Sequence, residues 1–163
     1  MCASYHSALL GLIGLHQEAV DEARRAVGLD SSAYLPRMVS VFAHQWAGDG
    51  NSALAAAEVA LRVSGRSPNT LAELSGIYAA RGDFRRALAA HQELLSRAST
   101  TWVDPTFLAI SALGAGEADE AMKHAFHAIE VNAPHQLWLL RRPGTEALHA
   151  HPSYLELRNR AGL

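Results

Sequence analysis

Glycine and alanine recur at a fixed spacing along this chain, and this spacing limits its fold more than any other feature of the sequence. A glycine returns every 34 residues, and an alanine follows each of these glycines five residues later. The positions are Gly14 and Ala19, Gly48 and Ala53, Gly82 and Ala87, and Gly116 and Ala121. A period of about 20–50 residues is typical of repeat proteins, in which each unit is one supersecondary element packed on its neighbours. The spacing therefore predicts four copies of one structural unit.

The third copy, residues 82–87, indicates what this unit is. Gly82 is suited to end one helix, and Asp83 is suited to cap the next one. Ala87 lets two helices approach closely, and we expect Phe84 to fill the angle between them. The pattern predicts a helix–turn–helix unit, whose first and second helices are called helix A and helix B below.

Composition agrees with a helical chain. Hydrophobic residues make up 49% of the sequence, and alanine and leucine dominate them. This mixture favours helix over sheet, so the predicted fold class is all-α. We expect a single domain over residues 1–163. Its predicted parts are repeats at about 4–30, 33–64, 68–97 and 104–131, and a C-terminal capping segment at 134–163, where the period fails. A solenoid needs such an end piece because the last repeat otherwise leaves an apolar face open.

The unit resembles the tetratricopeptide repeat (TPR), a helix–turn–helix motif with the same period. The small residue that the family has in helix A is present as Ser7, Val41, Ser75 and Ala109. The family's turn glycine and helix-B alanine are met in all four copies, whereas its tyrosine occurs only as Tyr78 and its elbow aromatic only as Phe84. The resemblance covers about residues 4–132. It implies a right-handed superhelical solenoid.

The end of the chain carries a second resemblance. Residues 102–105 (Trp-Val-Asp-Pro) and the closing stretch 150–163 are similar to the end of certain bacterial multidomain proteins. In those proteins a TPR array follows an adenylate-cyclase-like, kinase or winged-helix transcription-regulator module. This resemblance implies a regulatory or scaffolding part of a bacterial signalling protein. The 163 residues themselves contain no such catalytic or DNA-binding module.

The TPR resemblance also implies where a partner would bind, since the A helices of the family line an inner groove. Helical spacing then selects the inward-facing positions. They are Leu35, Met38, Phe42, Gln45 and Trp46 in the second repeat, Asn69, Ala72, Gly76, Ala79 and Ala80 in the third, and Val103, Thr106, Ile110 and Leu113 in the fourth. These groove residues give a floor of small side chains between two bulky apolar walls.

The chemistry of the groove indicates the partner. Family members that hold a peptide C-terminus do so with lysine and asparagine, but Met38, Ala72 and Thr106 are among the residues at those positions here. We therefore expect an amphipathic helix or an apolar peptide instead of a terminal carboxylate. Two alternatives stay open. The groove could be closed by the chain's own packing or by homo-oligomerisation, or it could bind a small-molecule effector.

The charge and cysteine content of the chain restrict its expected partners and its cellular compartment. The formal net charge is −2, and the signs are mixed, so neither nucleic acid nor a membrane surface is an expected partner. The longest apolar run, residues 8–15, is too short to span a bilayer, and no cationic segment precedes it. The single cysteine, Cys2, cannot form an internal disulfide. We expect a cytoplasmic protein.

No residue pattern predicts catalysis, a metal site or a cofactor. His124 and His127 lie three positions apart, but no cysteine or His-Glu-x-x-His partner accompanies them. Residues 64–67 and 113–116 lack the Lys-Ser/Thr pair of a phosphate loop and are predicted to be turns. His44 and His91 replace residues that would pack between helices, so we expect both to be interhelical histidines with satisfied hydrogen bonds.

Overall fold

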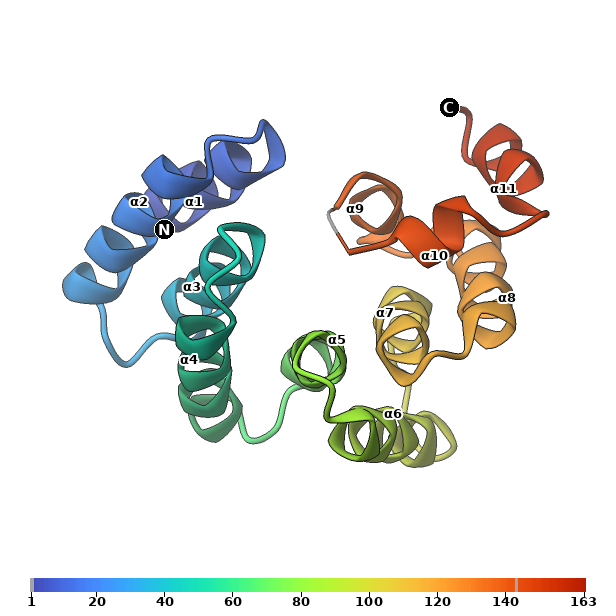
Figure 1. Cartoon of the computed structure of the whole chain (residues 1–163), viewed down its shortest axis with the longest axis horizontal. Helices are drawn as coiled ribbons and strands as arrows, with labels where there is room; N and C mark the ends of the chain where they lie inside the picture. Colours follow the sequence, from blue (N-terminus) through green and yellow to red (C-terminus); the bar gives the residue numbers. More distant parts are fainter. Residues whose placement is uncertain (1, 143) are drawn as a thin grey trace. The chain divides into compact units, whose positions relative to one another are not determined.

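The computed structural model describes residues 2–142 and 144–163, and all regular secondary structure in these residues is helical, with no strand. Within them lie eleven helices (Figure 1). They are α1 (Cys2–Leu12), α2 (His16–Leu29), α3 (Tyr34–Trp46), α4 (Gly50–Val63), α5 (Pro68–Ala80), α6 (Phe84–Ala98), α7 (Pro105–Ala115), α8 (Ala118–Glu130), α9 (Gln136–Arg141), α10 (Glu146–His149) and α11 (Tyr154–Arg160). The all-α prediction is confirmed.

The chain divides into two compact units, Met1–Thr70 and Leu71–Leu163, and the boundary falls inside α5. Each unit is described on its own below. The single domain expected over the whole chain stays a prediction.

The predicted turns are confirmed by the backbone. The four periodic glycines have φ values of +86°, +77°, +76° and +81°, in the left-handed region that favours glycine. At the next helix start, the Asp49 carboxylate accepts a hydrogen bond from Ser52 N at 3.0 Å, and the Asp83 carboxylate accepts one from Arg86 N at 3.1 Å. These bonds satisfy backbone donors that a helix start leaves unpaired. The glycine therefore ends helix A, and in these two copies the aspartate begins helix B.

In unit 1, α3 packs against α1, α2 and α4, and α1 packs against α2. The contact between α1 and α3 is close. A Cβ atom on Gly11 would lie 2.2 Å from the ring of Trp46, so only glycine fits at this point. The hydroxyl of Ser7 on α1 donates to the carbonyl of Ala19 on α2 at 2.8 Å.

Unit 2 repeats this hydroxyl contact. Ser75 Oγ lies 3.0 Å from the carbonyl oxygen of Ala87 on α6 and 2.8 Å from that of Ser111 on α7, so one side chain joins three helices. Gly114 permits the contact between α5 and α7, because a Cβ there would lie 2.6 Å from Ser75 C and 2.7 Å from Gly76 N. The C-terminal cap, residues 134–163 without residue 143, contributes α9, α10 and α11, which all contact α8.

The prediction for Phe84 is wrong. Its side chain is 66% exposed and does not fill the angle between two helices. Phe84 is the first residue of α6, directly after the Asp83 cap, and the apolar side of this helix is formed by Ala87, Ala90 and Leu94, which are buried. The periodic alanine, not the aromatic, therefore closes the elbow.

Candidate functional site

Most of the predicted groove residues on α3 are buried in the core of unit 1. Met38 is buried, and its sulfur lies 3.2 Å from Thr70 Oγ1. Phe42 and Trp46 are also buried and stack with their ring centroids 5.7 Å apart. Trp46 faces Gly11 of α1, so it belongs to the packing between α1 and α3. Of the groove residues, Leu35 and Gln45 on this helix are half-buried, as is Asn69 at the start of α5.

The groove residues of α5 and α7 differ in exposure. Ala72, Val103, Thr106 and Ile110 are buried. The half-buried ones are Gly76, Ala79 and Leu113, and Ala80 is exposed. In unit 2 the accessible part of the predicted groove is thus made of small residues, with Leu113 as its one large side chain among the described residues.

The chain's own C-terminal cap reaches this part of unit 2. Arg142 donates to both carboxylate oxygens of Glu73 on α5, at 2.5 and 2.6 Å, and both side chains are buried. Glu73 shares one face of α5 with Gly76 and Ala80, which follow it at helical spacing. The cap therefore touches the face that was predicted to bind a partner.

A second contact fixes the start of the cap. His135 Nδ1 lies 2.7 Å from the Asp104 carboxylate, and its ring lies 5.0 Å from that of Phe107. Asp104 also caps α7 by accepting from Thr106 N at 2.9 Å, so one buried carboxylate joins the helix start to the cap. Together with the contact of α9 with α7, these bonds show that the chain itself covers part of the A-helix surface in unit 2.

Three polar residues that the sequence analysis did not connect lie close together in unit 2. His91 on α6 is buried, with Nδ1 2.8 Å from Ser111 Oγ on α7 and Nε2 3.6 Å from the carboxylate of Glu117. Burial lowers the pKa of His91, while the carboxylates of Glu117 and Glu120 act in the opposite direction with smaller effect. The imidazole is therefore neutral at neutral pH.

The order serine, histidine, carboxylate matches that of a catalytic triad, but the hydrogen bonds give it another role. Ser111 Oγ donates to the Leu108 carbonyl at 3.0 Å, so it accepts from His91 Nδ1–H. A histidine that donates to a serine cannot take its proton as a general base. Ser111 is also fully buried. The contact is an interhelical hydrogen bond, as predicted for His91, but the expected full satisfaction of the ring is not met, because the buried Nε2 has no hydrogen-bond partner.

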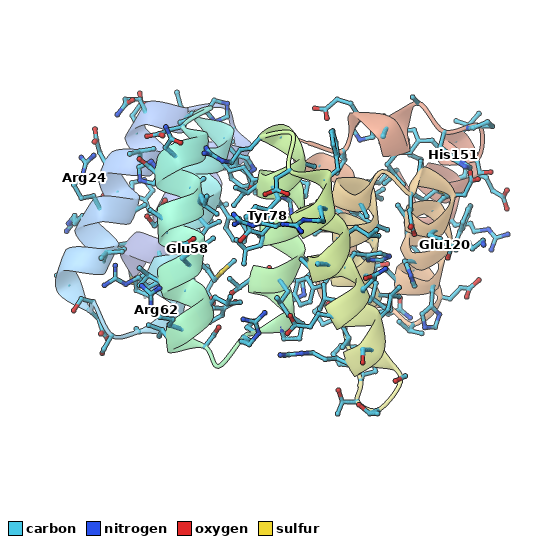
Figure 2. The ribbon with its side chains drawn as sticks, turned by 60° about the horizontal axis from the view of Figure 1, so that its bottom comes forward. Arg24, Glu58, Arg62, Tyr78, Glu120 and His151 are labelled. Carbon is cyan, nitrogen blue, oxygen red and sulfur yellow. The ribbon has the colours of Figure 1, made fainter. Side chains whose placement is uncertain are left out.

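An open pocket of about 420 Å³ lies at the start of α8, lined by residues 116–120. Two of its three carboxylates have close partners: Asp119 pairs with His151 Nε2 at 3.0 Å and Glu120 with Lys123 Nζ at 2.6 Å. Figure 2 shows His151 and Glu120 on the same side of unit 2. Acidic side chains at a helix start stabilise it through the helix dipole. In the described part of the chain, no three His, Cys, Asp or Glu side chains are placed to hold a metal ion.

No model of a known protein family and no curated protein matches this chain. Among the described residues, no helix combines the length and the apolar character that crossing a membrane requires.

The sequence prediction missed the ion pair between Glu73 and Arg142. Its one signal was Glu73 itself, a carboxylate among the apolar residues of a predicted helix A. Such a group must find a partner when it is buried, but 69 residues separate it from Arg142 and no period connects the two.

Proposed function

We propose that this chain is a non-catalytic protein–protein interaction module made of four TPR-like repeats in a right-handed superhelical solenoid. One observation carries the proposal. The four periodic glycines are all left-handed, and the four alanines that follow them are all 0% exposed. Four equivalent elbows at one period are what a helical solenoid requires, and solenoids use their extended surfaces to bind other proteins.

The proposed partner is a protein that presents an amphipathic helix or an apolar peptide. The proposed contact surface lies on α3 of unit 1, around the half-buried side chains of Leu35 and Gln45. In unit 1 the large apolar side chain of Leu35 is partly accessible. In unit 2, by contrast, Arg142 of the cap binds Glu73 on the corresponding helix α5. The similarity of the chain's end to bacterial regulatory proteins supports a role as the regulatory part of a cytoplasmic signalling protein.

The test compares two leucines of unit 1. Leu35 on α3 and Leu61 on α4 are both half-buried, so Leu35→Glu and Leu61→Glu are matched in chemistry and exposure. The purified chain and both variants serve as bait in a lysate of the source cells, and captured proteins are identified by mass spectrometry. We expect Leu35→Glu to lose a specific partner that Leu61→Glu retains.

The captured partner is then truncated to a helical peptide, and its affinity is measured by calorimetry. Circular dichroism checks that both variants keep the helical content of the wild type. Equal capture by the two variants, or a partner whose peptide binds both equally, would contradict the proposed surface on α3.

A further inference from the structure

The C-terminal cap contacts two A helices of unit 2 at one repeated position. Glu73 on α5 and Phe107 on α7 are 34 residues apart, so the period places them at equivalent points of their helices. The ring of His135 lies 5.0 Å from that of Phe107, and Arg142 pairs with Glu73. Between these two contacts the cap forms α9, which also contacts α7. Residues 135–142 therefore run from α7 to α5, from one equivalent point to the next.

On α5 this position holds an unusual residue. The other three copies have Tyr5, Val39 and Phe107 there, and none of these is charged. Glu73 is instead a carboxylate that is fully buried. Such a group needs a hydrogen-bonded counter-ion, and both of its oxygens accept from Arg142. Helix α5 thus carries a site for a guanidinium group on the face that was predicted to bind a partner.

The geometry of this pair selects arginine. Nη1 and Nη2 of Arg142 each donate to one carboxylate oxygen of Glu73, at 2.5 and 2.6 Å. This double contact needs the planar fork of a guanidinium group, which lysine does not have. Leu139 and Leu140, at the end of α9, are also buried. The segment that unit 2 binds is therefore an apolar helical turn that ends in arginine.

The contacts also allow one such segment to replace another. The cap helices α9, α10 and α11 contain six, four and seven residues, so they are too short to be stable by themselves and depend on their contacts with unit 2. A buried ion pair adds little net stability over an apolar pair, but the loss of one partner leaves a costly buried charge. Release of Arg142 is therefore unfavourable unless another guanidinium group takes its place at Glu73.

We propose that residues 135–142 are an internal ligand of unit 2, and that the surface they cover around Glu73 and Phe107 is a second binding surface for a partner protein. The segment of the partner that binds there is a short apolar helix that ends in arginine. This surface differs from the one proposed on α3, because α3 contains no acidic residue. The cap competes with the partner from within the same chain, at an effective concentration of about millimolar. It therefore keeps the surface closed to weak ligands.

The probe is a fluorescein-labelled peptide with the sequence of residues 133–142, and its binding to the full chain is followed by fluorescence anisotropy. The wild type should bind it weakly, because its own cap occupies the surface. Arg142→Ala in the chain should strengthen binding by about tenfold or more, since the competing arginine is gone. Arg141→Ala is the matched control, because Arg141 is the exposed neighbour on α9. It should bind the peptide as the wild type does.

The peptide itself tests the selectivity for arginine. In the peptide, Arg142→Lys or Arg142→Gln should weaken binding to the Arg142→Ala chain by about tenfold or more, whereas Arg141→Gln should have little effect. Circular dichroism checks that the Arg142→Ala chain is folded, and an Arg142→Lys chain replaces it if it is not.

The proposal is overturned if the peptide binds the variant chain no better than the wild type, or if peptides with and without the arginine bind equally. A wild-type dimer in light scattering that Arg142→Ala converts to a monomer would also overturn it, because the surface would then bind the cap of a second copy. None of these results bears on binding at α3, which the lysate experiment measures independently.

Discussion

Arg142 and Glu73 form a bidentate ion pair inside unit 2, although 69 residues separate them in the sequence. The side chains are 3% and 1% exposed. Thr145 donates to the Arg142 carbonyl at 2.9 Å and so holds the cap next to this pair. A buried pair of this kind adds little net stability over an apolar pair, but each partner depends on the other.

Removing either partner of this pair should destabilise the protein strongly. Arg142→Met leaves the Glu73 carboxylate buried without its counter-ion, and we expect it to lower the free energy of unfolding by about 3–5 kcal/mol. The double variant Glu73→Leu/Arg142→Met should recover most of this loss. Arg160→Met is the control, because its pair with Glu156 is exposed and should contribute about 0–1 kcal/mol. Urea unfolding measures all three. The prediction would be contradicted if Arg142→Met lowered the free energy of unfolding no more than Arg160→Met does.

Two helical glycines should respond in opposite directions to alanine. Gly114→Ala places a Cβ against the backbone of α5, and we expect a loss of about 1–3 kcal/mol from overpacking. Gly28, in the last turn of α2, has no atom within 4 Å of such a Cβ. Gly28→Ala should therefore stabilise by about 0.4–1 kcal/mol. Thermal unfolding distinguishes the two, and a neutral Gly114→Ala would show that α5 and α7 can separate at little cost.

Phe84 should be nearly dispensable for folding. Because its ring is mostly exposed, Phe84→Ala should change the free energy of unfolding by less than about 1 kcal/mol. Leu94 lies on the same helix and is fully buried, so Leu94→Ala should cost about 2–5 kcal/mol. Both variants are compared by chemical denaturation. If Phe84→Ala lowered the free energy of unfolding as much as Leu94→Ala does, Phe84 would have the packing role between two helices that the sequence first indicated.

Stability should fall in mildly acidic solution through His91. Its pKa in the folded protein is lowered from 6.5, mainly by burial, so below about pH 6.5 the unfolded chain takes up a proton that the folded protein resists. The loss of folding stability begins near pH 6.5, grows as the pH falls and levels off below the pKa of His91 in the folded protein. His124 adds to it, since burial, with the nearby His91, lowers its pKa as well.

His91→Gln should therefore flatten the fall in stability between about pH 7 and pH 5. Its amide can still donate to Ser111. His127→Gln is the control, because His127 is an exposed side chain on α8. Melting temperatures across this pH range test the prediction, which fails if the two variants show the same slope as the wild type.

The parts of the fold that the sequence predicted well are those that depend on local backbone chemistry. Gly82, Asp83 and Ala87 act over a few residues, and their roles as helix end, cap and close contact are confirmed. The prediction for Phe84 was wrong because the pattern of residues 82–87 gives the residue type at each position, whereas the exposure of a side chain depends on how the two helices pack. The contact between Arg142 and Glu73 could not be predicted, since it joins a non-periodic segment to a periodic one.

For the candidate site, too, local features were predicted and contacts between distant segments were not. Helical spacing identified Met38, Phe42 and Ala72 as one kind of position on successive A helices. It could not show that Trp46 packs on Gly11, or that the cap covers Glu73, because both depend on how separate helices meet.

The matching serine contacts provide a way to observe the two units one at a time. Ser7 donates to Ala19 in unit 1, and Ser75 makes the equivalent contact with Ala87 in unit 2, each across 12 residues. Ser7→Ala and Ser75→Ala delete the same chemical group from each unit, so each variant serves as a local probe of its own unit. Amide hydrogen exchange on the two variants would then show whether protection is lost in one half of the molecule or in both, and so whether this chain melts as one cooperative block or as two.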